Sequence, residues 1–316
     1  MNEYRGRHAP SQPWAVASTA SVRRGRHQRR NPRRRIRFIL LAILLLALLA
    51  YPFIESKILT VDKKLVASKD LPSDANHLRI VYVSDIHWGF WYSDADLGGL
   101  LSRINSLRPD LVLFGGDYAT DNASAIQFFQ HLQSQLKIHT RYGIYGVLGE
   151  NDVGETAFDR QRLTEAMIAA EVTPLVNQTV PVYIGSGSKI LIAGLDDAIA
   201  GKPAIKSVAS SVSGSDYVIL LCHNPSVIPE AQRATDSSGS LGWFDLGLFG
   251  HTHGGQMMFF SSLLDIAGDV PDGYRSGWLR ENRSELLVSR GVGTSVIPFR
   301  LGCYPQIHLI ELTTSD

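Results

Sequence analysis

From residue 78 onwards, short apolar runs alternate with longer stretches in which apolar residues recur at a helical spacing. Continuous apolar runs near 79–84, 111–114 and 144–148 predict buried strands. The stretches that separate and follow them predict helices near 94–107, 123–137 and 157–170. Asp94 is expected to cap the first helix, and Arg108-Pro109 is expected to end it. Such alternation is typical of a sheet covered by helices.

The second half of the chain is richer in strands than the first half. Two runs at 180–184 and 189–193 flank a Gly-Ser-Gly-Ser turn and predict a hairpin. Further strands are expected at 217–221, 244–249, 285–289 and 307–312, and helical pieces near 203–212 and 226–234. Two sheets packed face to face, with helices on the outside, accommodate this number of elements.

A different pattern precedes residue 78. Residues 1–35 are rich in Arg, Ser, Pro and Gln and lack an apolar period, which predicts a disordered tail. Residues 36–54 are apolar apart from Arg37, and this predicts a transmembrane signal anchor. Because basic residues favour the inner side of a membrane, the tail is expected to be cytoplasmic. The domain after the anchor is then expected on the non-cytoplasmic side of the cell membrane.

Two other interpretations of the N-terminal region remain open. The apolar stretch could be a cleaved signal peptide, although Leu48-Leu49-Ala50 is a poor cleavage site. The run Arg34-Arg35-Ile36-Arg37-Phe38 loosely resembles a twin-arginine export signal. Residues 55–77 are predicted to form a polar stalk, and Ile58 to Val66 contain apolar positions that suit an edge strand.

The charge is divided unevenly along the chain. Of 31 basic and 30 acidic residues, eleven arginines and one glutamate lie in residues 1–37. Residues 38–316 therefore carry an acidic excess, which disfavours nucleic acid as a partner of the folded domain. The two cysteines, Cys222 and Cys303, do not mark a disulfide scaffold and are expected to be buried thiols, although export would permit a bond.

Metal-ligand side chains follow five of the predicted strands. They are Asp85 and His87, Asp117, Glu150 or Asn151, His223, and the pair His251 and His253. Functional sites of α/β sheets collect at the carboxyl ends of strands, so these side chains are expected to meet. In an extended chain residues i and i+2 point the same way, so His251 and His253 are expected to face one site. Mixed carboxylates and imidazoles suit Mn, Fe, Zn, Co or Ni.

The order of these motifs resembles the calcineurin-like metallophosphoesterase family. The pattern DxH, GD, a GN-like turn, H and GHxH extends over roughly residues 78–312. The ending, from Val288-Ser289-Arg290-Gly291 through Pro298-Phe299-Arg300-Leu301-Gly302, is similar to a membrane-anchored, YkuE-like subgroup. The resemblance implies an α/β fold with a four-layer α/β/β/α sandwich, here the metallophosphoesterase domain of residues 78–316.

The resemblance also implies two divalent metal ions bridged by Asp117. One ion would take Asp85, His87, Asp117 and His253, and the other would take Asp117, Glu150, His223 and His251. Two such ions activate a hydroxide that attacks phosphorus directly. Asp85, Asp117 and His251 are the expected catalytic residues, and no serine or cysteine nucleophile is required.

Three positions depart from the family pattern. Glu150 stands where the family has an asparagine ligand, and a shift of one residue would make Asn151 the ligand instead. Asn151 otherwise stands where the family often has a histidine that protonates the leaving group, and asparagine cannot act as a general acid. Thr120 replaces the second aspartate of the GDxxD pattern, and Asp121 follows it.

The substrate class follows only in outline. We expect a phosphodiester or pyrophosphate in a phosphorylated small molecule or a lipid or cell-envelope precursor. Some relatives hydrolyse the pyrophosphate of UDP-2,3-diacylglucosamine, and a catalytically weak metal-binding protein is a second alternative. Aromatic residues after the first motif could form a lip for a lipid or pack within the loop: Trp88, Phe90, Trp91 and Tyr92. Arg290 and Arg300 could contact a phosphate or hold the C-terminal loop.

Overall fold

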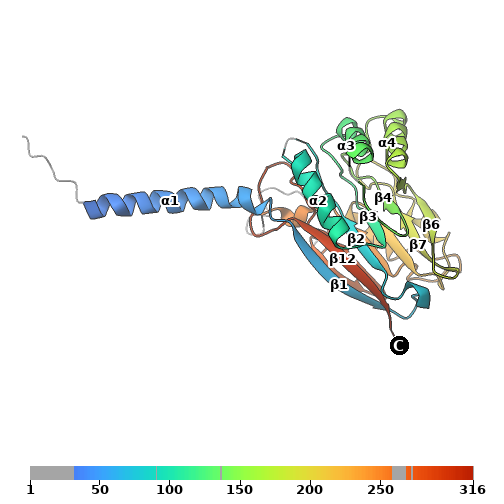
Figure 1. The fold of residues 1–316 in the computed structure, drawn as a ribbon. Helices are drawn as coiled ribbons and strands as arrows, with labels where there is room; N and C mark the ends of the chain where they lie inside the picture. Colours follow the sequence, from blue (N-terminus) through green and yellow to red (C-terminus); the bar gives the residue numbers. More distant parts are fainter. Residues whose placement is uncertain (1–31, 90, 136, 258–267, 272, 316) are drawn as a thin grey trace, which may run out of the picture. The chain divides into compact units, whose positions relative to one another are not determined.

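The computed structural model describes residues 32–89, 91–135, 137–257, 268–271 and 273–315. The chain divides into two compact units, Met1–Leu46 and Ala47–Asp316. Most of the predicted tail, residues 1–35, lies outside the described residues. Helix α1 (Pro32–Glu55) contains the predicted anchor and extends beyond it at both ends (Figure 1). Its segment Arg33–Glu55 has a mean hydropathy of 2.5 over its most apolar window and is long enough to cross a membrane.

One six-stranded sheet is built around the first predicted strands. Its strands in spatial order are β1 (Thr60–Ser68), β12 (Gln306–Thr314), β2 (Arg79–Val83), β3 (Leu111–Phe114), β4 (Ile144–Gly146) and β5 (Val172–Pro174). Strands β2 to β5 are mutually parallel, β12 is antiparallel to β2, and β1 is parallel to β12. The suggested edge strand within 55–77 is therefore present and pairs over nine residues with the C-terminal strand.

The second sheet also has six strands. In spatial order they are β10 (Gly277–Glu281), β11 (Ser284–Val288), β9 (Leu246–Phe249), β8 (Val218–Leu221), β7 (Ser188–Gly194) and β6 (Gln178–Ile184). The four inner strands are parallel, and β6 and β10 pair antiparallel at the two edges. Strands β10 and β5 were not expected from the sequence, because both are short and neither has an uninterrupted apolar run.

Helices flank the sheets and differ in length between the two sides. They are α2 (Asp94–Ser106), α3 (Asn122–Gln135), α4 (Ala157–Ala169), α5 (Ile205–Ala209) and α6 (Ile228–Ala231), with 3-10 turns η1 (Ser73–Ala75), η2 (Pro225–Val227) and η3 (His253–Gly255). The predicted helices at 203–212 and 226–234 are thus shorter than expected. Ser93, rather than Asp94, caps α2 through a capping box with Asp96, so the cap prediction was wrong by one residue.

Alternating side chains of each strand explain the four layers. In β2, Ile80 and Tyr82 enter the core between the two sheets, whereas Val81 and Val83 pack under α2, α3 and α4. In β8, Ile219 faces the core between the sheets, and the intervening side chains pack under α5 and α6. The observed order is helix, sheet, sheet, helix, which confirms the predicted α/β/β/α sandwich. Figure 1 shows α2, α3 and α4 on the outer side of the first sheet.

The parallel strands bring the expected ligands to one edge of the sandwich. The loops after β2, β3 and β4 leave one sheet at the same end, and those after β8 and β9 leave the other. Gly116 has φ +89°, and a Cβ there would lie 2.5 Å from the Gly149 backbone nitrogen. Only glycine therefore permits the loops after β3 and β4 to approach this closely.

Candidate metal centre

Five of the seven expected ligands have left-handed backbone conformations. Their φ angles lie between 48° and 68° at Asp85, His87, Asp117, His251 and His253. Such angles are unfavourable for residues with a Cβ and persist only where surrounding contacts hold them, commonly at functional sites. The extended backbone expected at His251 and His253 is absent, although both imidazoles reach the site. The chain turns at both residues, and the second histidine begins η3, so their imidazoles enter two different groups.

The first group joins Asp85, His87 and His253. The Nε2 atoms of the two histidines lie 3.0 Å apart, and Nε2 of His253 lies 3.7 Å from Oδ1 of Asp85. All three side chains are buried, and their ligand atoms lie within 4.8 Å of one another. These donors come from the ends of β2 and β9, so strands of both sheets contribute to the group.

The second group joins Glu150, His223 and His251. The carboxylate of Glu150 lies 2.8 Å from Nε2 of His223 and 2.9 Å from Nδ1 of His251. The rings of the two histidines meet edge to face at 5.5 Å. The structure therefore brings the side chain of Glu150, and not that of Asn151, between these two imidazoles.

Asp117 lies between the two groups. Its Oδ2 atom is 3.5 Å from Nε2 of His87 and 3.6 Å from Nε2 of His223. Nε2 of His223 is also 3.9 Å from Oδ1 of Asp85, so Asp85, Asp117 and His223 form a third, connecting group. All seven residues that the sequence proposed as ligands are therefore gathered at one place.

Three buried metal-ligand atoms of the site make no hydrogen bond of good geometry in the described structure: Oδ2 of Asp85, Oε2 of Glu150 and Nε2 of His223. The last two lie 2.8 Å apart as an ion-pair contact without hydrogen-bond geometry. The other ring nitrogen of His223 donates a hydrogen bond to the carbonyl of Gly115 at 2.7 Å, so Nε2 retains its lone pair when the ring is neutral. Unsatisfied buried lone pairs are costly, and divalent cations would satisfy them. The donor set therefore fits metal ions.

Burial and neighbouring charges shift the pKa values of the site histidines in opposite directions. Burial opposes protonation of His223, but the charges of Asp117 and Glu150 outweigh it and hold its pKa well above the usual value. Burial likewise opposes protonation of His251, and contact with Glu150 raises its pKa to about 9. Burial raises the pKa of Asp85 and of Asp117. Without a cation the site therefore retains protons that metal binding would displace.

Two aspartates that the sequence analysis gave no role position this site. Asp152 is buried and accepts hydrogen bonds from the backbone N–H groups of Asp117 at 2.7 Å, Gly149 at 2.8 Å and Tyr118 at 3.1 Å. It therefore holds the loops after β3 and β4 together. Its place in the Gly149–Asp152 turn was visible in the sequence, but its backbone partners were not.

Asp269 is the second such residue. Its Oδ1 atom lies 3.1 Å from Nε2 of His251, and its Oδ2 atom accepts a hydrogen bond from the Asn224 amide at 2.6 Å. A carboxylate on the second nitrogen of a metal-binding histidine fixes the ring and strengthens it as a ligand. No motif surrounds Asp269, so the sequence offered no signal for this contact.

The departures from the family pattern have distinct environments. Asn151 donates hydrogen bonds from its backbone N–H and its amide to the two carboxylate oxygens of Asp117, at 3.0 and 2.6 Å. Asp121 accepts a hydrogen bond from the Ser124 backbone N–H at 2.8 Å, and Thr120 is an exposed neighbour. Asp121 therefore serves the start of α3.

Arg300 is fully buried behind His253. Its guanidinium donates to the carbonyls of Gly293 and Cys303 and lies 3.3 Å from Nδ1 of His253. Of the two roles considered for this residue, the contacts support the one in which it holds the C-terminal loop. Cys303 and Cys222 are both buried and free, as expected.

The aromatic residues after the first motif do not form one lip. Tyr92 is buried, and Trp88 donates a hydrogen bond to Asp94 and stacks on His131. Trp91 is exposed. Phe90 lies outside the described residues. Packing thus accounts for Trp88 and Tyr92, and exposure to a ligand remains an interpretation for Trp91 alone.

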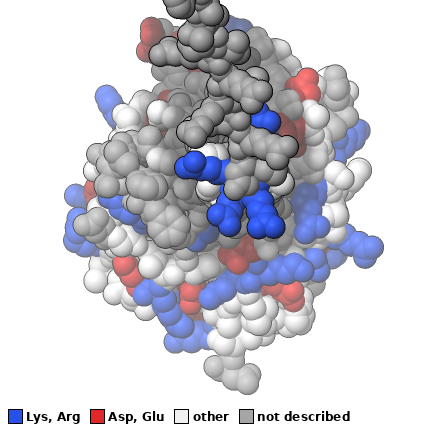
Figure 2. Space-filling view, turned by 90° about the vertical axis from the view of Figure 1, so that its left-hand side faces the viewer, with Lys and Arg blue, Asp and Glu red and all other residues white. Residues whose placement is uncertain are grey.

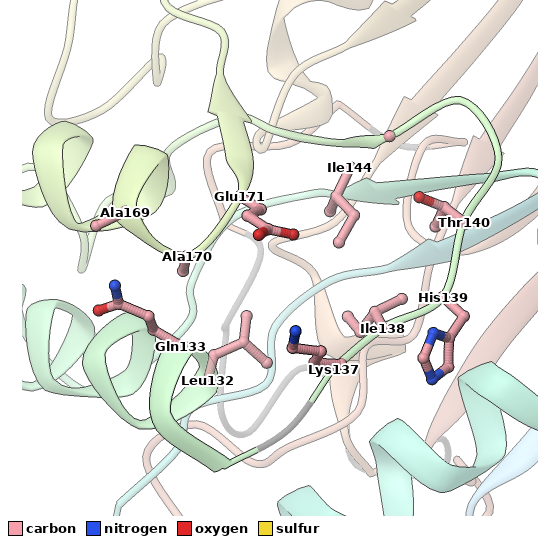
Figure 3. A pocket seen from close by; sticks show the side chains of 11 residues that line it. Leu132, Gln133, Lys137, Ile138, His139, Thr140, Ile144, Ala169, Ala170 and Glu171 are labelled. Atoms are coloured by element: carbon pink, nitrogen blue, oxygen red, sulfur yellow. The ribbon is translucent and has the colours of Figure 1, made fainter.

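Two hollows differ in their relation to this centre. One, of about 550 Å³, adjoins it and is lined by Glu150 and Asn151 together with residues at the starts of α3 and α4. The other, of about 410 Å³, lies between the ends of α3 and α4, where Lys137 and Glu171 line it (Figure 3). It borders Ile144, the first residue of β4, so it lies at the amino end of that strand and away from the ligands.

Comparison with known proteins agrees with the geometry. Residues 78–255, more than half of the chain, match the model of the calcineurin-like phosphoesterase family. The chain is 28% identical to the Bacillus subtilis protein named uncharacterized metallophosphoesterase YkuE, over 84% of this chain and 89% of that protein. It is 30% identical to Bacillus subtilis YpbG, over 74% and 81%.

A vertebrate relative is named as a transmembrane protein. The chain is 28% identical to the Danio rerio transmembrane protein with metallophosphoesterase domain, over 77% of this chain and 54% of that protein. The gathered ligands, the two-sheet sandwich and the family match lead to one conclusion. The chain belongs to the calcineurin-like phosphoesterase family and is a metallophosphoesterase, a phosphoric ester hydrolase.

Proposed function

We propose that this phosphoesterase is a membrane-anchored, dinuclear enzyme that cleaves a phosphodiester or pyrophosphate. The observation that carries the proposal is the position of Asp117 between two ligand groups, with Asp85 and His223 completing the connection. A carboxylate has two oxygens and can serve two adjacent cations. One cation would be held by Asp85, His87, Asp117 and His253, and the other by Asp117, Glu150, His223 and His251.

Divalent ions at these positions, of the Mn, Fe, Zn, Co or Ni type, supply Lewis-acid stabilisation of phosphoryl charge and lower the pKa of water. The side chains of the site have complementary duties. Asp85 and Asp117 provide negative charge at fixed positions, because their backbones are held by neighbouring loops. His251 is oriented by Asp269, and Asn151 directs its amide at Asp117.

The position of Asn151 restricts the substrate. An amide cannot protonate a leaving group, so substrates whose leaving groups depart as stable anions are favoured. A pyrophosphate meets this condition, since its leaving group is a phosphate ester. UDP-2,3-diacylglucosamine is one compound of this class, and a lipid or cell-envelope precursor is another.

The anchor supports a substrate at or near a membrane. Helix α1 has the length and hydropathy of a single span, and the arginines before it favour a cytoplasmic tail by the positive-inside rule. The catalytic domain would then be on the non-cytoplasmic side of the cell membrane. This topology fits an envelope substrate better than a cytosolic nucleotide.

Asn151, which stands where the family often has a general acid, favours a second function. If Asn151 abolishes turnover, the protein would be a metal-binding protein with weak catalysis. The seven gathered ligands suit both functions, because both bind metal, so turnover is the property that separates them.

Hydrolysis of bis-p-nitrophenyl phosphate tests the proposal. The full chain in detergent is preferable to a truncated domain, because the Arg300 backbone N–H donates to the Pro52 carbonyl within α1. Chelation should abolish turnover, add-back should restore it with two metal ions per chain, and Asp117→Asn should lower both turnover and stoichiometry. Asp74→Asn, a surface change beyond the site, should leave both unchanged.

The outcomes separate the two functions. Restored turnover that is lost in Asp117→Asn supports the enzyme. Two bound metal ions without turnover, on this diester and on a pyrophosphate, would favour the binding protein. One metal ion per active chain would refute the dinuclear site.

A further inference from the structure

Within the unit Ala47–Asp316, large apolar side chains remain exposed around the end of α1. They come from three segments that are distant in sequence, and we call them the apolar collar: Tyr51, Phe53, Trp91, Val296 and Tyr304. The exposed fractions reach 50% at Phe53, 52% at Trp91 and 78% at Val296. A group of exposed apolar residues on one region of a surface commonly marks an interaction site.

Specific contacts hold these three segments together. The hydroxyls of Tyr51 and Tyr304 form a hydrogen bond of 2.9 Å, and the rings of Phe53 and Phe299 pack at 5.3 Å. On the other side, Lys57 donates a hydrogen bond of 2.8 Å to the Trp91 carbonyl. These contacts join the end of α1 to the segment containing Trp91 and to the C-terminal loop that contains Val296 and Tyr304.

The helix end is also joined to the C-terminal loop through its backbone. The buried carboxylate of Glu55 accepts the Cys303 backbone N–H at 2.7 Å, and the Pro52 carbonyl accepts that of Arg300 at 3.1 Å. These bonds fix the loop that carries Val296 and Tyr304 relative to the last turns of α1. The collar residues therefore remain together without depending on their own apolar contacts.

The most exposed member of the collar is held in an unfavourable conformation. Val296 has φ 39°, which is a genuine outlier for a β-branched residue. Buried Gln256 fixes the backbone on both sides, because it accepts the Ser295 N–H at 2.9 Å and donates to the Ile297 carbonyl at 2.7 Å. The Val296 backbone is therefore held in a strained conformation that exposes its apolar side chain. Within the protein, neither hydration nor packing of this side chain offsets the strain.

We infer that the apolar collar is a membrane-contact surface whose partner is the interface of the phospholipid bilayer that α1 enters. Tyr and Trp are enriched at this depth, because their rings are apolar and their polar atoms reach the headgroups. This inference rests on the proposed membrane anchoring: the collar is continuous in sequence with the candidate span, which favours the bilayer over another protein as the occupant. Figure 2 shows one face of the molecule on which Lys and Arg side chains are more extensive than Asp and Glu side chains, and such a charge balance suits anionic headgroups.

Two segments of the collar are linked to the loops that carry the metal centre. Trp91 follows His87 by four residues, and Gln256, which holds the Val296 loop, follows His253 by three. Contact with the bilayer therefore orients the domain, since the helix end and both loops must lie at the same depth. A tether of one helix alone would leave the domain free to tilt.

Spin labels at collar positions test this surface in the full chain reconstituted into phosphatidylethanolamine and phosphatidylglycerol vesicles. The test variants are Val296→Cys and Trp91→Cys. The matched controls are Tyr183→Cys in β6 and Phe158→Cys in α4, whose native side chains are 67% and 64% exposed. Both native cysteines are buried, and labelling of the unmodified chain provides the background.

Collision with oxygen, relative to a water-soluble nickel chelate, should be several-fold more frequent at both collar labels than at both controls. Oxygen concentrates in the bilayer, whereas the chelate is excluded from it. The proposal is overturned if a folded collar variant has the same ratio as the controls. Two collar positions are used, so loss of folding in one variant still leaves the other decisive. The readout does not depend on catalytic activity.

Discussion

Replacement of Asp152 with asparagine should separate the support of the metal centre from its ligands. The carboxylate accepts three backbone N–H groups, two at Oδ2 and one at Oδ1. Asparagine can present one oxygen to Asp117 and Gly149, but its NH₂ group then faces the N–H of Tyr118. One bond to a charged acceptor is lost, and buried donors are left opposed.

The magnitude follows from these contacts. Loss of a hydrogen bond to a charged group costs about 1.5–3 kcal/mol, and an unsatisfied buried donor costs about 1–3 kcal/mol. Removal of the repulsion between Asp152 and Asp117 offsets part of this cost. We expect Asp152→Asn to lower the free energy of unfolding by about 2–4 kcal/mol. For a domain of this size the melting temperature should fall by at least about 4 °C.

Thermal unfolding of the metal-free full chain in detergent measures this effect. Asp74→Asn is the matched control, because Asp74 also accepts three hydrogen bonds, from Ser186 and Ser188, but at the surface. The control should change the melting temperature by less than about 2 °C, since surface substitutions usually cost less than 0.5 kcal/mol. Equal melting temperatures for Asp152→Asn and the native chain would refute the proposed role of the three bonds.

Three further predictions concern other groups. Asp269→Ala should weaken metal binding about 10–100-fold in a calorimetric titration, because His251 loses its orienting carboxylate; unchanged affinity would contradict that role. Burial raises the pKa of Asp245 to about 6. The protonated Asp245 carboxyl therefore contributes fully to the stability of the folded chain below about pH 4, and this contribution is lost as pH rises through 6. Between pH 5 and 7.5 the native chain should lose about 1 kcal/mol relative to Asp245→Asn in unfolding measurements, and parallel pH profiles would exclude this. Asn151→His should raise turnover of alkyl diesters about 100-fold without accelerating nitrophenyl diesters, whose anions leave unprotonated; equal effects on both would argue against a restored acid.

Local patterns were sufficient for most of the fold. The uninterrupted apolar runs that form β2, β3 and β8 stand out in the sequence, because parallel strands are buried on both faces. Helices α2, α3 and α4 also followed from spacing. Short edge strands β5 and β10 did not, because their pairing comes from neighbouring strands rather than from their own residues. The exchange of Asp94 for Ser93 as the cap shows the ordinary limit on helix boundaries.

The sequence also showed which side chains could bind metal, but not how they are arranged in space. Each of the seven ligands follows a predicted strand, and strand ends are close in sequence to the residues they position. The division of His251 and His253 between two groups followed from the family resemblance, but the left-handed turns that produce it were not evident, because neighbouring loops impose them. Glu150 was favoured by register alone, whereas its contacts with two imidazoles required the other sheet.

By itself, the sequence determined the apolar helix, the order of strands and helices, and the chemical types available for metal binding. These properties depend on residues close together in the chain. Only the tertiary structure decided that Asp152 holds two loops, that Asp269 reaches His251, and that the end of α1 joins the loop containing Arg300. Those contacts join residues separated by 18 to 248 positions. No local pattern encodes them, because packing of the two sheets chooses which distant loops meet.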